Sequence, residues 1–234
     1  MKKIISVSII MILLFSVCFI SGCFKVVEYG DFRCKFRETL VDIEGLSEEG
    51  KNKEVIFIPE KINGCKVKLI GRVPTTTALP ADFSSDKLKR LYLEINFYLG
   101  NTRFKDVKNL EKVFILGLPD GPGALKELPV PTFTKKSDVE KYEGIRDLIP
   151  ANISYFYNYE GAPNDGYYWI DDMEDGETIK YIPENPIREG YLFGGWFKDE
   201  ACTEVWDFEK DTIVKPADGY YENILYAKWN KKNF

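Results

Sequence analysis

The sequence predicts a mainly β protein of the α+β class, built from a short leading segment and two modules. Three observations support this. Apolar and polar residues alternate in several short runs, one apolar pattern recurs 22 residues later, and a stretch rich in Pro and Gly separates regions of opposite charge. With 234 residues, the chain is long enough for two small domains. We expect boundaries at residues 1–22, a first module at 23–148 and a second module at 149–234.

The leading segment has the pattern of a secretory signal. Lys2 and Lys3 precede an uncharged, apolar run from Ile4 to Gly22. The run ends in Ile20-Ser21-Gly22-Cys23, which resembles the lipobox of bacterial lipoproteins. This resemblance implies that Cys23 is acylated and holds the protein on the extracellular face of the bacterial membrane. Two alternatives are a transmembrane anchor, since the run could just span a bilayer, and an ordinary cleaved signal peptide.

The first module contains an internal repeat. Leu88–Leu93 and Leu110–Ile115 share the pattern L-x-x-Φ-x-Φ, where Φ is apolar, and each reads as a short strand with alternate side chains facing a core. Val55–Ile58 reads as an earlier strand of the same kind. Strands at this spacing predict a short leucine-rich-repeat solenoid, in which each repeat buries its apolar face against its neighbours.

A family resemblance points the same way. The string VIFIPEKINGCKVKLIG (55–71) resembles the opening turns of BspA-like leucine-rich repeats, and KSDVEKYEG (136–144) resembles the segment that closes such arrays. The likeness covers roughly Val26 to Arg146 but breaks down between Pro74 and Asp86. It therefore implies a short, irregular array with a terminal cap. The alternative is a generic small β-rich domain.

The second module reads as strands and turns. Ile153–Tyr159 alternates apolar and polar residues, and Gly176–Ile182 reads as another strand that Pro183 stops. The remainder resembles the Listeria–Bacteroides repeat known from internalins, which implies a small β-grasp-like domain with several strands and one short helix. The residues that carry this resemblance are Pro186, Arg188, Gly190, Tyr191, Phe193, Gly195, Trp196, Cys202, Trp206, Asp207, Phe208, Leu225, Tyr226, Ala227 and Trp229.

The outward positions of the solenoid strands predict an interaction face, because repeat arrays bind partners on such surfaces. We expect a protein or glycan partner there. Trp169 lies outside the repeat motif and adds a candidate exposed aromatic residue. The candidate face consists of Lys89, Arg90, Tyr92, Lys112, Phe114 and Trp169.

Charge is distributed unevenly between the modules. Residues 51–116 hold 13 Lys and Arg against 7 Asp and Glu, whereas residues 151–234 hold 8 against 17. With a lipid at Cys23, the basic region would lie close to the membrane, where it could contact anionic polymer or headgroups. The alternative is a set of scattered solubilising charges. The overall net charge of −5 argues against a nucleic-acid partner.

Several classes of chemistry are disfavoured. Histidine is absent, and there is no Walker-type glycine loop, no G-x-S-x-G and no pair of C-x-x-C motifs. The acidic run 171–176 fails as an EF-hand loop, because Met173 occupies a position that needs an oxygen ligand. We therefore expect that run to be a solvated hairpin tip. We also expect no enzyme activity, no cofactor and no bound metal.

Three cysteines remain after Cys18 in the signal and the acylated Cys23 are set aside. Cys34, Cys65 and Cys202 permit at most one disulfide. Cys34 and Cys65 could form it if their strands are neighbours, or all three could be reduced.

Together these features predict a lipid-anchored surface protein that acts by interaction, like an adhesin or receptor. The alternative is a structural spacer or self-association module of the cell envelope with no specific soluble ligand.

Overall fold

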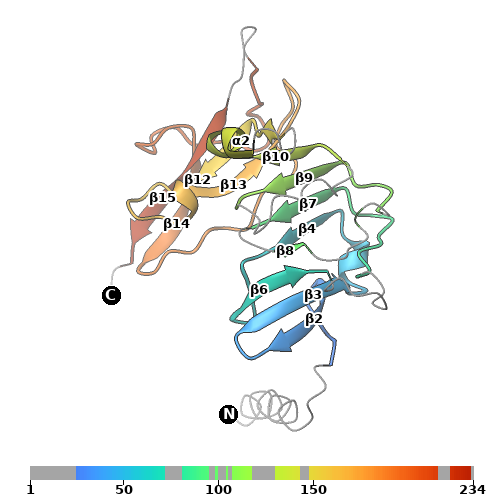
Figure 1. Ribbon diagram of the computed structural model, residues 1–234. Coiled ribbons are helices and arrows are strands. Elements are labelled where there is room, and N and C mark those ends of the chain that lie inside the picture. Colours follow the sequence, from blue (N-terminus) through green and yellow to red (C-terminus); the bar gives the residue numbers. More distant parts are fainter. Residues whose placement is uncertain are drawn as a thin grey trace, which may run out of the picture.

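The protein was analysed as a computed structural model that describes residues 25–71, 81–94, 98–99, 104, 107–117, 130–142, 148–215 and 222–232. The predicted signal segment, residues 1–22, and Cys23 lie outside the described residues. The described chain forms three β-sheets with few helical turns (Figure 1), so the mainly β class is confirmed. No helix in these ranges is both long and apolar enough to cross a membrane.

The first sheet lies at the lower end of the view in Figure 1. Its strand order is β1-β2-β3-β6-β5, with β8 also paired to β6. Strands β1 to β3 form an antiparallel meander, whereas β3 and β6 are parallel. A 3-10 turn, η1 (Gly50–Asn52), follows β3. The bounds are β1 Val27–Tyr29, β2 Phe32–Arg37, β3 Leu40–Leu46, β5 Lys61–Ile62, β6 Cys65–Ile70 and β8 Tyr98–Leu99.

The second sheet is parallel throughout, and its strands follow one another in chain order. Arg90 pairs with Lys112 and Leu93 with Ile115, so the 22-residue pattern places equivalent positions on adjacent strands. A helix, α2 (Lys136–Val139), and a 3-10 turn, η4 (Glu140–Tyr142), precede the last strand. The strands are β4 Val55–Ile58, β7 Arg90–Leu93, β9 Lys112–Ile115, β10 Thr132–Thr134 and β11 Ile149–Pro150.

The third sheet forms the second module. Its order is β13-β12-β15-β14, with β12 and β15 parallel at the centre and an antiparallel strand on either side. A 3-10 turn, η5 (Asn164–Gly166), is the only helical element among the described residues after β11. The strands are β12 Ile153–Phe156, β13 Tyr167–Asp171, β14 Tyr191–Phe197 and β15 Asn223–Lys231.

The strand expected at Gly176–Ile182 is wrong. This segment pairs with residues 212–213 through a single bridge between Thr178 and Thr212 and two flanking backbone hydrogen bonds. Ile179 nevertheless enters the core of the second module. The apolar alternation therefore records burial of a side chain without a regular ladder.

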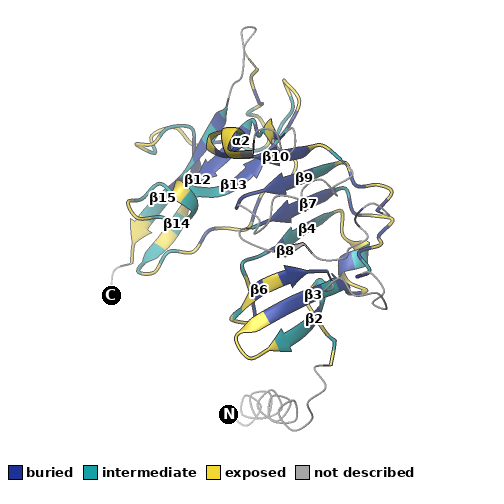
Figure 2. Cartoon of the chain, in the orientation of Figure 1, coloured by how far each residue is buried: buried dark blue, intermediate teal, exposed yellow. Residues whose placement is uncertain are grey.

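The second sheet is covered on both faces, as is usual for a parallel sheet. Leu91 and Leu93 face a core shared with the first sheet. The alternate residue of the same strand, Tyr92, faces a second core that continues into the second module. Every residue of β7 is buried, as Figure 2 shows. The second module therefore packs on the outward face of the second sheet.

The cysteines of the first module are not joined. Cys34 lies on β2 and Cys65 on β6, with β3 between them. Two steps of about 4.8 Å between strands exceed the Cα separation that a disulfide allows. Cys34, Cys65 and Cys202 are all free thiols.

We expect Cys34 of the folded protein to resist thiol reagents. It is fully buried, and burial raises the pKa of its thiol to about 12, so the reactive thiolate is scarce. Under non-denaturing conditions a thiol reagent should label Cys65 and Cys202 before Cys34, as peptide mass spectrometry would show. Rapid labelling of Cys34 in the folded protein would contradict this placement.

Candidate functional site

A ladder of aromatic rings crosses the outward face of the second sheet. Phe57, Tyr92, Phe114 and Phe133 are register partners on β4, β7, β9 and β10. The rings of Tyr92 and Phe114 stack with centroids 4.5 Å apart, and those of Phe114 and Phe133 with centroids 5.2 Å apart. Trp169 of β13 completes the ladder from the second module, with its ring centroid 4.0 Å from Tyr92.

Ion pairs flank this ladder. Arg90, which precedes Tyr92 by two residues on the same face of β7, pairs with the fully buried Asp171 of β13. Its guanidinium also donates to the Asp172 carbonyl oxygen at 3.2 Å and lies 4.4 Å from the ring centroid of Tyr181. Lys112, the register partner of Arg90, binds the Asp172 carboxylate at 2.7 Å. The basic region 51–116 of the first module and the acidic second module thus meet through matched charges.

The expectation of an open interaction face is therefore wrong. Tyr92 and Phe114 are 0% exposed, Arg90 is 6% exposed and Trp169 is 7% exposed. Lys112 is half-buried beneath Asp172. The physical reason is that large aromatic rings and complementary charges pack together when a second domain is available to cover them.

Lys89 differs from the other residues of the predicted face. It lies at the rim, partly exposed, and pairs with Glu54 at 3.1 Å. The expected solvated tip at 171–176 is also only partly correct. Asp171 and Met173 are buried in the contact between the modules, whereas residues 174–176 are exposed.

Sequence reasoning missed four residues of this contact: Phe57, Phe133, Asp171 and Asp172. Two signals in the sequence point to it. Aromatic residues recur at equivalent outward positions, which is unusual for a solvated face. The basic region 51–116 and the acidic second module also carry opposite charges. Such charges favour docking between the modules as much as they favour binding to separate partners.

Asp171 gives the contact a pH dependence. Burial raises the pKa of its carboxyl to about 6, although the ion pair with Arg90 opposes the shift. Because the pKa in the folded state lies above its unfolded value, the folded protein binds this proton first as the pH falls. The contribution of Asp171 to the free energy of unfolding should therefore rise between pH 7 and pH 5.

The measurement is the free energy of unfolding of the wild type and of Asp171→Asn across this range. The wild type should gain stability relative to the variant on acidification, since asparagine does not titrate. The difference between wild type and variant cancels the contributions of other carboxyls, such as Asp42 and Glu94, whose pKa values are also raised by burial. If the free energy of unfolding of the wild type falls relative to that of the variant on acidification, this assignment is contradicted.

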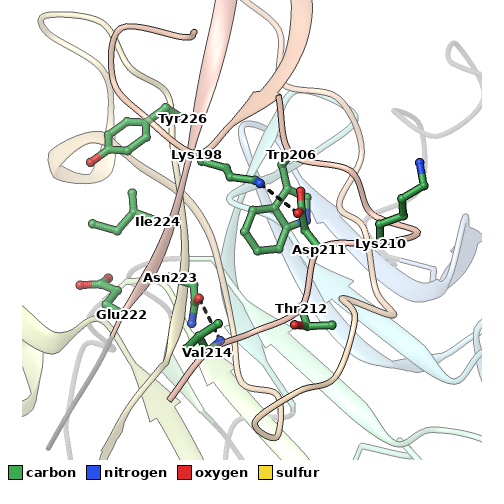
Figure 3. Close-up of a pocket in the computed structure, with 10 residues that line it drawn as sticks. All are labelled: Lys198, Trp206, Lys210, Asp211, Thr212, Val214, Glu222, Asn223, Ile224 and Tyr226. Atoms are coloured by element: carbon green, nitrogen blue, oxygen red, sulfur yellow. Dashed lines mark hydrogen bonds and ion pairs between the residues drawn. The ribbon is translucent and has the colours of Figure 1, made fainter. Parts of the chain in front are cut away.

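An open groove lies on the second module, away from the ladder (Figure 3). Its volume is about 530 Å³. The side chains of β15 line one side, and the segment 206–214 lines the other with Lys198 (Figure 3). The lining residues are Lys198, Trp206, Lys210, Asp211, Thr212, Val214, Glu222, Asn223, Ile224 and Tyr226.

The groove combines fixed charges with an apolar surface. The Lys198 ammonium binds Asp211 at 2.9 Å, and the second carboxylate oxygen of Asp211 accepts the Asp207 backbone N–H at 2.7 Å. The buried Trp206 indole N–H has no hydrogen-bond partner among the described residues. Ile224 and Tyr226 are half-buried, leaving part of each side chain open to solvent. Such a surface can bind a polar ligand by hydrogen bonds and apolar contact.

Two observations concern metal ligation and the thiol of Cys202. The described residues contain no cluster of three or more Asp, Glu, Cys or His side chains that could hold a metal ion. Burial raises the pKa of the Cys202 thiol, which disfavours the thiolate that a nucleophile requires.

Two proteins of Evansella cellulosilytica are similar to short parts of this chain. One, named "Putative membrane protein", is 52% identical over 58 residues, which are 24% of this chain and 8% of that protein. The other, named "Putative Gly-rich membrane protein", is 47% identical over 47 residues, which are 20% of this chain and 5% of that protein. The matches thus span less than a tenth of either relative's length. No solved structure matches the chain significantly.

A family model matches most of the second module. One matched segment includes β13, β14, most of β15, the lining of the groove and the buried Trp169, Trp196 and Trp206. Residues 155–228 match the family model of the Listeria-Bacteroides repeat domain.

Proposed function

We propose that this chain is a lipid-anchored bacterial cell-surface protein that acts by binding and carries out no catalysis. In this proposal, a short leucine-rich-repeat solenoid forms the membrane-proximal base, and a β-grasp-like repeat is fixed on top of it. The lipobox at Cys23 supports the anchor, and the names of the two relatives support a membrane location. The in-register parallel strands and the order β13-β12-β15-β14 support the two folds.

One observation favours the second module as the place where a partner would bind. The sheet face of the first module, which is the usual binding face of such arrays, is covered by the second module. Among the described residues, the groove of the second module is an open concave surface that a ligand could reach. Its aromatic and charged lining suits a protein or a glycan.

The test is a glycan and protein array probed with the mature chain, residues 24–234. The groove variants are Tyr226→Ala and Lys198→Ala. The matched controls are Tyr29→Ala and Lys180→Ala, because both residues are exposed and lie outside the groove. Loss of a hit with the groove variants alone supports the proposal. A hit that all four variants retain would contradict the groove as the binding site.

The competing function is a structural spacer or self-association module with no soluble ligand. The shared core between the modules favours it, because a rigid two-module body suits a spacer. If the wild type binds nothing on the array and forms a dimer in analytical sedimentation, the structural function is favoured.

The lipid anchor has its own test. Mass spectrometry of the protein from its native membrane should show an acylated N-terminal Cys23, and Cys23→Ser should prevent acylation. Unmodified Cys23 in membrane-bound protein would contradict the anchor.

A further inference from the structure

The outer face of the first sheet is rich in cationic side chains. In β2 the buried residues Phe32 and Cys34 alternate with outward ones, and in β6 the buried Val67 separates two exposed lysines. Six cationic residues share this outer face: Arg33, Lys35, Arg37, Lys61, Lys66 and Lys68. The acidic residues of the same face are Glu28, Asp42 and Glu44.

The pairing register gathers part of this face into one row. Arg37 is the partner of Leu40, Leu40 of Lys66, and Lys66 of Lys61, on four neighbouring strands. Direct partners project on the same side of a sheet. All four side chains are exposed, and the exposed ends of β3 and β6 lie side by side in Figure 2. Asp42, which balances part of this charge through Arg37, is buried.

The chain enters the sheet at the same end. Val27, the first residue of β1, pairs with Cys34, and β1 runs antiparallel to β2. The N-terminal end of β1 therefore points toward Arg37 and the row. Lys25, just before this strand, is exposed and adds another positive charge there. Glu38 and Glu60 are the acidic residues of the adjoining turns.

The tether to the lipid is short. Four residue steps separate Cys23 from Val27, and an extended chain spans at most about 3.6 Å per step, or about 14 Å in all. A lipid at Cys23 would hold Val27 within about two Debye lengths of the headgroups at physiological salt, where the Debye length is about 8 Å. The row lies on the strands that follow β1 in the sheet.

We propose that the row formed by Arg37, Leu40, Lys61 and Lys66, with Lys25 beside it, docks on an anionic lipid bilayer. The short distance between the row and the membrane rests on the proposed lipid anchor at Cys23. The positive charge of the row is a property of the folded sheet and does not depend on the anchor. Docking would orient the protein with the first sheet on the membrane and the groove of the second module away from it. The lysines, and not the candidate face proposed from the sequence, supply the attraction, because Arg90 and Lys112 are already paired with the second module.

The experiment uses the mature chain without lipid, residues 24–234, so that it does not depend on acylation. Binding is measured by co-sedimentation with vesicles of phosphatidylcholine containing 30% phosphatidylglycerol and with vesicles of phosphatidylcholine alone. The test variant is Lys61→Glu/Lys66→Glu. The matched control is Lys231→Glu/Lys232→Glu, which changes the net charge equally at exposed positions of the second module.

We expect binding to the anionic vesicles only, with a loss on raising salt. At about 1 kcal/mol for each lysine near the surface, the test variant should bind at least about 30-fold more weakly, and the control variant should bind like the wild type. Equal weakening by both variants would overturn the proposal, because it would show a net-charge effect. Binding to soluble polyphosphate without binding to vesicles would overturn it as well. If mass spectrometry shows that Cys23 is acylated but the protein does not bind the anionic vesicles, the docking proposal fails and the lipid anchor stands. If the protein binds the vesicles but Cys23 is unmodified, only the lipid anchor fails.

Discussion

Trp169→Ala is expected to lower the free energy of unfolding by about 3–5 kcal/mol, the range found when a large buried aromatic side chain is truncated in a core. Trp169 is 7% exposed and packs on both Phe57 and Tyr92 across the contact between the modules. Alanine would leave a cavity and expose the top of the ladder. Urea denaturation, followed by circular dichroism, measures the loss.

The matched control is Tyr159→Ala. Tyr159 is also an aromatic residue of the second module, but it is half-exposed. Its ring lies under the Arg188 guanidinium and meets Trp229 edge to face, away from the ladder. Its replacement should cost clearly less. A Trp169→Ala protein as stable as the wild type, to within about 0.5 kcal/mol, would show that the packing between the modules contributes little.

Arg90→Met is expected to cost about 3–5 kcal/mol, because it leaves the buried carboxylate of Asp171 without its counter-ion. Methionine fills similar volume but supplies no positive charge and no hydrogen bonds. The companion double variant Arg90→Met/Asp171→Leu should recover much of the loss, since no buried charge remains. Denaturation of the single and double variants at pH 7 measures both effects.

The neighbouring Lys89→Met serves as the control for Arg90→Met. Lys89 forms a solvent-exposed pair with Glu54, and pairs of this kind contribute little to the free energy of unfolding. Equal losses at positions 89 and 90 would contradict the buried character of the Arg90 pair. A double variant less stable than Arg90→Met would contradict the explanation by an uncompensated charge.

Local alternation of apolar and polar residues predicts several strands of the fold. The paired pattern at Leu88–Leu93 and Leu110–Ile115 predicts two strands, and the structure places them side by side with equivalent residues in register. This works because alternation of apolar residues follows directly from the two-residue period of a strand. Ile179 shows the limit, since its burial gives the same pattern without a regular strand.

The contact between the modules could not be read from the same local patterns. Tyr92 and Phe114 alternate with apolar residues, as the outward positions of any exposed strand do, and only the covering domain decides whether they meet water. Asp171, 81 residues beyond Arg90, looks like part of an acidic hairpin tip when its segment is considered alone. Such long-range pairing depends on three-dimensional register and not on local periodicity.

The most direct test of one cooperative body is to follow both modules through the same urea titration. All four tryptophans belong to the second module, so their fluorescence reports its unfolding, whereas labelling of the buried Cys34 reports the first module. If the modules share a core, the two transitions should coincide at one urea midpoint. A fluorescence change at urea concentrations that leave Cys34 protected would show that the second module unfolds independently, and would contradict the shared core.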